Sequence, residues 1–492
     1  MKDIVEIVVP DTVGKKGSLY IRDKLQKVLY SFIGHESFGG ILLFFCVVVA
    51  MVIANTSSLS DSYFKFWETK IGFCINDVNY SMSILHFIND VLMSLFFLMV
   101  GLEMKREVLY GDLAGFKKVS FSIFAALGGI IIPIIIYVLF NYNTDASKGF
   151  GVAMSTDTAF ALGVVLLMGK RIPSVIKIFL VTLAVADDLG AVTVIAIFYT
   201  EDLQILWIVF SCIIVTALIY LNYKDTKFIF LYFVFGILLW IAVYKSGIHP
   251  TVAAVILAFC IPGKTKVSSV YFEKMLKEWQ KIDFDEIQQM KEIHTRKKRG
   301  FFKKLRDGIK NFIHPSAEKK IDMYRASKYI YILDSIGRYS YAAQNPLLRT
   351  EHALQPICAY FIVPLFAFAN GGVLINQGID FLNSGIMWGT IFGLVLGKPL
   401  GILIFAYLSE RLKISIRPRG LKYSHVLAVG FLAGIGFTMS MFVSGLAYAE
   451  NDMINISKLS VLIASALAIV FGVIALFFST KVKEKNGAKN IS

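Results

Sequence analysis

Apolar residues in this chain gather into long segments that are separated by shorter polar stretches. A helix needs about 20 mostly apolar residues to cross the hydrocarbon core of a bilayer. Twelve segments fit this requirement, and they are numbered here as spans 1 to 12: 38–55, 84–104, 119–140, 150–168, 173–199, 203–222, 227–244, 247–262, 353–375, 386–409, 424–447 and 458–480. The pattern predicts an all-α polytopic membrane protein, and its composition, 56% hydrophobic and 17% charged, excludes a soluble domain of this size.

Basic residues predict the orientation of the spans. Short loops on one side hold 14 Lys and Arg residues, whereas short loops on the other side hold 5. Because Lys and Arg are enriched in cytoplasmic loops, we expect the basic side to be cytoplasmic. An even number of spans then places both termini on that side.

One long polar segment interrupts the pattern. Residues 263–350 hold 20 Lys and Arg against 10 Asp and Glu, out of a net charge of +15 for the whole chain. Such a local basic excess favours a cytoplasmic insertion near anionic lipid, not nucleic-acid binding. The expected regions are a cytoplasmic extension at 1–37, spans 1–8 within 38–262, the insertion at 263–350, spans 9–12 within 351–480 and a cytoplasmic tail at 481–492.

Three carboxylates lie inside the spans. Asp157 is in span 4, and Asp187 and Asp188 are in span 5. A carboxylate at bilayer depth costs roughly 2.5–3.5 kcal/mol even on insertion scales, so such residues usually face a wet cavity and handle protons or ions. Lys398 in span 10 is a basic residue at similar depth, and it needs a carboxylate partner or loses its proton.

Two spans carry signs of interruption. Ser155 to Thr158 in span 4 are consecutive polar residues, and Ser, Thr and Asp favour helix starts over helix interiors. Gly430, Gly434 and Gly436 weaken span 11 in a similar way. Interrupted segments in corresponding positions of two halves are typical of inverted-repeat transporters, so we predict repeats formed by spans 3–5 and 10–12.

The segment between spans 1 and 2 alternates in polarity. It reads KIGFCINDVNYSM from Lys70 to Met82, and Asn76 and Asp77 at its centre tolerate the backbone of a tight turn. We predict a small extracytoplasmic β-hairpin here, and an irregular loop is the alternative.

Long motifs in the spans resemble the NhaA family of sodium/proton antiporters. They include INDVLMSLFFLMVGLEMKRE at 88–107, TDTAFALG at 156–163, KIFLVTLAVADDLGA at 177–191, LGKPLG at 396–401 and GIGFTMSMF at 434–442. The resemblance is collinear and covers all spans, but not the N-terminal extension or the 263–350 insertion. It implies that interrupted helices 4 and 11 cross at mid-membrane, and that the chain is a multi-pass protein of the bacterial inner (plasma) membrane.

The resemblance also implies a function and a site. The chain would exchange Na⁺ or Li⁺ for protons, at about two protons per sodium ion, and would export sodium to control pH and sodium levels. Asp188 and Asp187 would bind the cation and protons, Thr156 would add an oxygen, and Asp187 would pair with Lys398. Asp157 and Lys398 would compensate the charges of the helix breaks, although Asp157 could also be an ordinary helix cap. Neither an enzyme activity nor a cofactor is expected.

Regulation and assembly are further implications of the resemblance. It assigns pH sensing to Glu103, Arg106, Glu107, His249, Glu351 and His352. The alternative is that GLEMKRE merely marks a cytoplasmic helix end and that His249 is a cap. The protein would contact membrane lipid, and it would form a homodimer through the extracytoplasmic hairpin at 70–82. Other functions left open are a passive cation channel, a proton-coupled symporter of a small solute, and an inactive scaffold.

Overall fold

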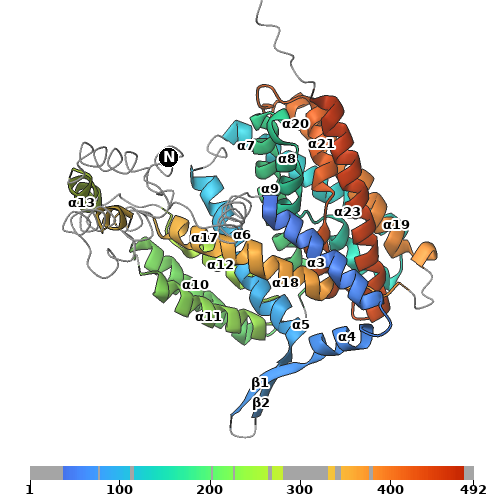
Figure 1. Ribbon diagram of the computed structural model, residues 1–492, viewed down its shortest axis with the longest axis horizontal. Helices are drawn as coiled ribbons and strands as arrows, with labels where there is room; N and C mark the ends of the chain where they lie inside the picture. The colour runs from blue at the N-terminus through green and yellow to red at the C-terminus, as the bar shows by residue number, and fades with distance from the viewer. Residues whose placement is uncertain are drawn as a thin grey trace, which may run out of the picture.

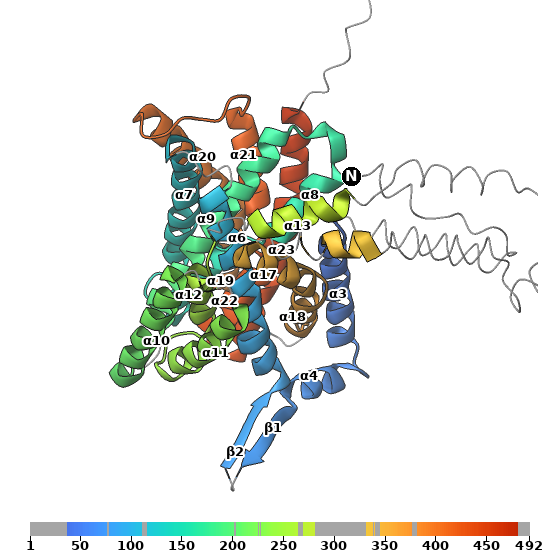
Figure 2. The same ribbon diagram turned by 90° about the vertical axis from the view of Figure 1, so that its left-hand side faces the viewer.

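The computed structural model describes residues 37–75, 78–110, 116–200, 203–224, 226, 228–263, 269–280, 331–337, 339, 345–375 and 381–480. Most of them are helical, as Figures 1 and 2 show. The predicted terminal extensions and most of the 263–350 insertion lie outside the described residues, so the predicted division into regions stays a prediction.

The first half of the chain contains a hairpin and a series of apolar helices. Its elements are α3 (Ser37–Asn55), α4 (Ser60–Glu68), β1 (Lys70–Ile75), β2 (Val78–Ser83), α5 (Ile84–His86), η1 (Phe87–Leu92), α6 (Met93–Tyr110), α7 (Phe116–Phe140), η2 (Asp145–Ala153), α8 (Thr158–Leu167), η3 (Gly169–Arg171), α9 (Ser174–Phe198), α10 (Ile205–Tyr223), α11 (Ile229–Lys245) and α12 (Thr251–Cys260). Here η1 is a π-helix, and η2 and η3 are 3₁₀-helices.

In the second half, the residues that the structure describes form helices and connecting turns. Its elements are α13 (Ser269–Trp279), α17 (Pro346–Ile357), η4 (Cys358–Ile362), α18 (Val363–Asn370), η5 (Phe381–Asn383), α19 (Gly385–Phe392), η6 (Gly393–Gly397), α20 (Lys398–Arg411), α21 (Tyr423–Ala433), α22 (Phe437–Ala447) and α23 (Asn451–Ser479). Two of these, η4 and η6, are π-helical turns inside longer helices.

Helices overlap all twelve predicted spans, and the all-α polytopic class is confirmed. Among the described residues, eight helices are long and apolar enough to cross a membrane, or up to ten if each of two bent pairs is one span. The helices α11 and α12 are apolar but shorter. The count of twelve crossings therefore stays a prediction.

Helix packing is close at glycines that face each other. A Cβ added to Gly128 on α7 would meet the backbone of Gly401 on α20, and a Cβ on Gly401 would meet Gly128. Small residues at such contacts let helix backbones approach closely in a membrane, where apolar burial from water does not drive association. This contact holds α20, which begins with Lys398, against α7.

The predicted hairpin is present. Strands β1 and β2 pair antiparallel with Lys70 opposite Ser83 and Ile75 opposite Val78. The turn residues Asn76 and Asp77 lie outside the described residues. The two strands project away from the helices in both views (Figures 1 and 2).

The two ends of the insertion are held together. Asn345, the N-cap of α17, donates from Nδ2 to the Gly263 carbonyl at 2.6 Å and accepts from the Leu348 N–H at 2.8 Å. The Tyr110 hydroxyl donates to the same Gly263 carbonyl. The chain therefore leaves and re-enters the bundle at one place.

Candidate cation site

Spans 4 and 11 are both interrupted, as predicted, and their breaks touch. The stretch between η2 and α8 is extended, while α21 and α22 are bent by 50° around Gly434 to Gly436. The Asp157 N–H donates to the Ile435 carbonyl at 2.6 Å, and the Thr156 hydroxyl donates to the Ala433 carbonyl at 2.7 Å. The two breaks therefore cross and satisfy some of each other's free backbone groups.

Asp157 lies where two helices begin. Its Oδ1 accepts from the Phe160 N–H at 3.1 Å and so caps α8, and its Oδ2 accepts from the N–H and the hydroxyl of Thr438 at 3.2 and 2.6 Å. Helix N-termini carry about +0.5 of an elementary charge, so an anion between two of them is stabilised. The helix-cap role and the charge-compensation role thus have the same geometry.

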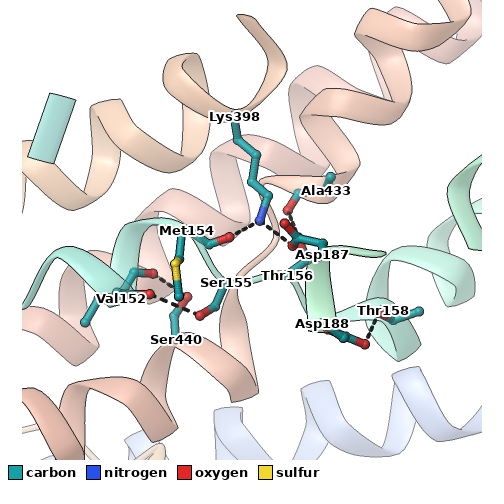
Figure 3. A network of polar contacts seen from close by, with 11 residues as sticks. Val152, Met154, Ser155, Thr156, Thr158, Asp187, Asp188, Lys398, Ala433 and Ser440 are labelled. Carbon is teal, nitrogen blue, oxygen red and sulfur yellow. Dashed lines mark hydrogen bonds and ion pairs between the residues drawn. The ribbon is translucent and has the colours of Figure 1, made fainter. Parts of the chain in front are cut away.

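Lys398 is fully buried, with 0% of its surface exposed. Its Nζ donates to Asp187 Oδ2 at 2.8 Å and also to the carbonyl of Met154, which follows the last residue of η2 (Figure 3). A carbonyl at a helix C-terminus carries partial negative charge. The ammonium group therefore joins the carboxylate of α9 to the negative end of the first half of span 4.

Asp188 has a different partner. Adjacent helical residues point about 100° apart, and Figure 3 shows the Asp188 side chain directed away from Lys398, toward Thr158. Its Oδ2 accepts from the Thr158 hydroxyl at 3.3 Å. Asp187 Oδ1 is buried and has no hydrogen-bond partner among the described atoms, so each carboxylate keeps an oxygen that could accept a proton or a cation.

Oxygen atoms supply the acceptor groups around the two breaks. Within the described part of the chain, no group of three His, Cys, Asp or Glu residues could hold a metal ion. Two carboxylates, nearby Thr hydroxyls and unwound backbone carbonyls remain, and such donors bind Na⁺ or protons where transporter helices are broken.

Sequence reasoning missed several groups at this site. Thr158 contacts Asp188, whereas the predicted ligand Thr156 donates its proton to Ala433. Ser440 donates to the Val152 carbonyl at 2.8 Å, and Ser155 donates to the Gly151 carbonyl at 3.1 Å. The polar run Ser155 to Thr158 indicated that the site lies here. It did not show which hydroxyl contacts a carboxylate and which contacts a backbone carbonyl.

Four of the six residues assigned to pH sensing form one cluster. Arg106 on α6 lies 2.8 Å from Glu107, 3.8 Å from Glu103 and 2.9 Å from Glu351 on α17. Glu351 is buried. Its ion pair with Arg106 joins two helices that are far apart in the sequence.

The two histidines lie outside that cluster. The His352 side chain is exposed on α17. His249 Nδ1 is 2.8 Å from the Thr251 hydroxyl, its Nε2 is 3.9 Å from Asp90, and its ring packs against Phe442. The structure therefore does not unite the six residues at one place.

Comparison with known proteins gives consistent matches. The family model described as Na⁺/H⁺ antiporter 1 matches residues 30–476. The Na⁺/H⁺ antiporter NhaA of Wolinella succinogenes is 46% identical over 464 residues, which cover 94% of this chain and 96% of that protein. The Na⁺/H⁺ antiporter NhaA 2 of Helicobacter hepaticus is 46% identical over 471 residues, 95% of this chain and 99% of that protein.

A third relative is the Na⁺/H⁺ antiporter NhaA of Helicobacter pylori strain 26695, which is 45% identical over 455 residues, 92% of this chain and 96% of that protein. Residues 263–350 are nearly a fifth of the chain, so matches of this extent must include most of them. The expectation that the resemblance does not cover the insertion was therefore wrong. On these matches, the chain belongs to the Na⁺/H⁺ antiporter 1 family, a family of multi-pass membrane transporters.

Proposed function

We propose that this chain exchanges Na⁺ or Li⁺ for protons and exports sodium at the expense of the proton gradient. The observation that carries this proposal is the position of Asp187 and Asp188, buried on one helix beside two crossed breaks, with Lys398 paired to only one of them. Charged groups kept at such a cost in membrane helices mark ion or proton pathways.

Competition for the carboxylates is sufficient for exchange. A carboxylate that holds a proton cannot coordinate Na⁺ at the same oxygens, so loading one releases the other. Asp188 is the principal cation ligand, Asp187 contributes its unpartnered Oδ1, and the hydroxyls of Thr156 and Thr158 add neutral oxygens. If the site opens to one side at a time, a proton gradient drives sodium out.

Asp157 and Lys398 compensate the charges of the broken helices. Asp157 lies at the positive N-terminal ends of α8 and α22, and Lys398 lies at the negative C-terminal end of η2. In a low-dielectric interior, a helix break whose partial charges are compensated by opposite side-chain charges costs less free energy than an uncompensated break. The break can therefore be kept beside the cation site.

The exchange is electrogenic, at about two protons for each sodium ion. Two groups supply the protons, Asp188 and the pair of Asp187 with Lys398, while a single cation site lies between them. We further propose that the cluster of Arg106, Glu103, Glu107 and Glu351 regulates this exchange by pH.

We also propose that the protein lies in the bacterial inner membrane with both termini cytoplasmic, and that it dimerises through the hairpin of β1 and β2. The distribution of Lys and Arg between the short loops supports the orientation. The projection of the hairpin beyond the helices supports its use as a contact between two copies.

The test is transport by the purified full chain in proteoliposomes. With an imposed pH gradient, added Na⁺ or Li⁺ should dissipate the gradient, and sodium should move against its own gradient. Asp188→Asn, which keeps the shape but removes the charge, should abolish both effects. Full exchange by this variant would refute the site. Flux that never runs uphill would indicate a channel instead, and proton uptake that needs an organic solute would indicate a symporter.

A further inference from the structure

The first half of span 4 has an unusual conformation. Helix η2 is a 3₁₀-helix of nine residues, whereas runs longer than three or four residues are uncommon because their hydrogen bonds are poorly aligned. It ends next to Met154, whose carbonyl accepts from Lys398. A 3₁₀-helix rises about 2.0 Å per residue against 1.5 Å for an α-helix, so conversion of four residues would withdraw this carbonyl by about 2 Å.

One tyrosine hydroxyl binds two backbone groups of η2. The hydroxyl of Tyr199, just after α9, donates to the Lys148 carbonyl at 2.8 Å and accepts from the Gly151 N–H at 3.0 Å. These two backbone groups are three residues apart, so a 3₁₀ turn would pair them directly. The ring of Tyr199 also stacks on Phe150, at 5.8 Å between centroids. Tyr199 thus joins η2 to the helix that carries Asp187 and Asp188.

Two further tyrosines hold the start of η2. The Tyr137 hydroxyl on α7 donates to the Ala146 carbonyl at 3.0 Å, and it is also hydrogen-bonded to the hydroxyl of Tyr448, just after α22. Both side chains are buried. Because α22 follows the break of span 11, Tyr448 attaches η2 to the span that crosses span 4.

Glycines in η2 leave room for these hydroxyls. A Cβ on Gly149 would overlap the hydroxyls of Tyr448 and Tyr137, and a Cβ on Gly151 would overlap Tyr199. The close approach therefore depends on residues that have no side chain at these two positions.

We propose that Tyr137, Tyr199 and Tyr448 are positioning residues for cation exchange, because their hydroxyls hold η2 at the length that brings the Met154 carbonyl to Lys398. The proposal rests on the proposed function, since it adds to that function a device that sets the apparent affinity for the cation. Lys398 Nζ divides its hydrogen bonds between Met154 and Asp187. Without the Met154 carbonyl, the ammonium group is held by Asp187 alone, and a cation must compete harder for that carboxylate.

The experiment measures KM and kcat for Na⁺ and Li⁺ in proteoliposomes at one alkaline pH. The variants Tyr448→Phe and Tyr199→Phe remove one hydroxyl each and keep the ring. Loss of a hydrogen bond of ordinary strength corresponds to about a five-fold change in an equilibrium constant, so KM should rise about three- to ten-fold while kcat changes less than about two-fold.

Gly149→Ala provides a second route to the same result, because its methyl group displaces the hydroxyls without removing them. Its KM should rise as in the Phe variants. The controls are Tyr142→Phe, whose side chain is exposed near the start of η2, and Gly445→Ala, whose new methyl group would meet nothing within 4 Å. Both controls should keep the parental KM and kcat.

Two outcomes would overturn the proposal. One is an unchanged KM in the two Phe variants and in Gly149→Ala. The other is a fall in kcat or in the amount of folded protein with the parental KM, which is the effect of a merely structural contact. The parental chain separates these failures from a failure of the proposed function, because exchange by the parental chain is measured first in the same vesicles.

Discussion

Asp187 and Asp188 are neighbours in the chain, yet their side chains have different partners. Asp187 contacts the ammonium group of Lys398, and Asp188 contacts the neutral hydroxyl of Thr158. Substitutions of the two partners should therefore have different effects, even though both acids belong to one proposed site.

Lys398→Ala should shift the pH profile of exchange more than it abolishes cation binding. The substitution removes the ammonium partner of Asp187 but leaves Asp188 with its own partner, Thr158. Exchange measured from pH 6 to 9 tests this, with Asp188→Ala as the comparison, since that variant should lose cation binding at every pH. Loss of binding at every pH in Lys398→Ala as well would contradict the separation of roles.

The identity of the acids could be predicted from the sequence, but their partners could not. A carboxylate in an apolar segment is conspicuous because it is costly. The Met154 carbonyl leaves no such mark, since every residue has a backbone carbonyl. Thr156 and Thr158 are equally polar, and only the path of the chain through the break decides which of them meets Asp188.

At the scale of the helices, the carboxylate of Asp157 contacts both crossed breaks. Asp157 accepts hydrogen bonds from both α8 and α22. Asp157→Asn removes the charge and turns an amide N–H₂ toward donors of Phe160 or Thr438. Because hydrogen bonds to a charged group contribute about 1.5–3 kcal/mol, we expect a loss of about 2 kcal/mol in unfolding free energy and a lower Tm.

Thermal unfolding in detergent, followed by intrinsic fluorescence, measures this effect. The matched control is Asp145→Asn, an exposed acid in the first turn of η2. Such surface changes usually stay within about 0.5 kcal/mol. Equal melting temperatures for the two variants would show that Asp157 does not hold the crossing together.

Local sequence predicted the broken helices but not their internal geometry. Consecutive Ser, Thr and Asp residues and repeated glycines indicated both breaks, because these residues weaken a helix wherever they occur. The 3₁₀-helix η2 is contacted by tyrosines on α7 and just after α9 and α22, and local patterns do not reveal these contacts. Helix α17 begins at Pro346, before the predicted start of span 9, and its buried Glu351 pairs with Arg106 of α6.

At the scale of the whole molecule, the hairpin of β1 and β2 projects beyond the described helices in Figures 1 and 2. Replacing Asn76 and Asp77 by two prolines should prevent its turn and weaken the proposed dimer. Replacing both by glycine should keep the dimer, because glycine adopts the positive φ angles of tight hairpin turns. Native gels and sedimentation of the detergent-solubilised protein test this, and a dimer unaffected by the prolines would exclude the hairpin as the contact.

The apolar composition and the charge distribution of the chain predicted the all-α polytopic class, because a bilayer permits few backbone arrangements. Contacts between distant segments were beyond local patterns. The salt bridge of Arg106 with Glu351 joins residues on either side of the long insertion, and only the packing of α6 against α17 brings them together.

The hydrogen bond from Asn345 to Gly263 bears on how the length of the chain between them can change in evolution. Because contacts of the bundle hold Gly263 beside Asn345, the two ends of this segment stay together whatever its length. Even for a fully flexible connection, each doubling of length adds only about 0.6 kcal/mol to the entropic cost of closure. Residues could therefore be gained or lost between these two points at small thermodynamic cost, while the crossed helices remain in place.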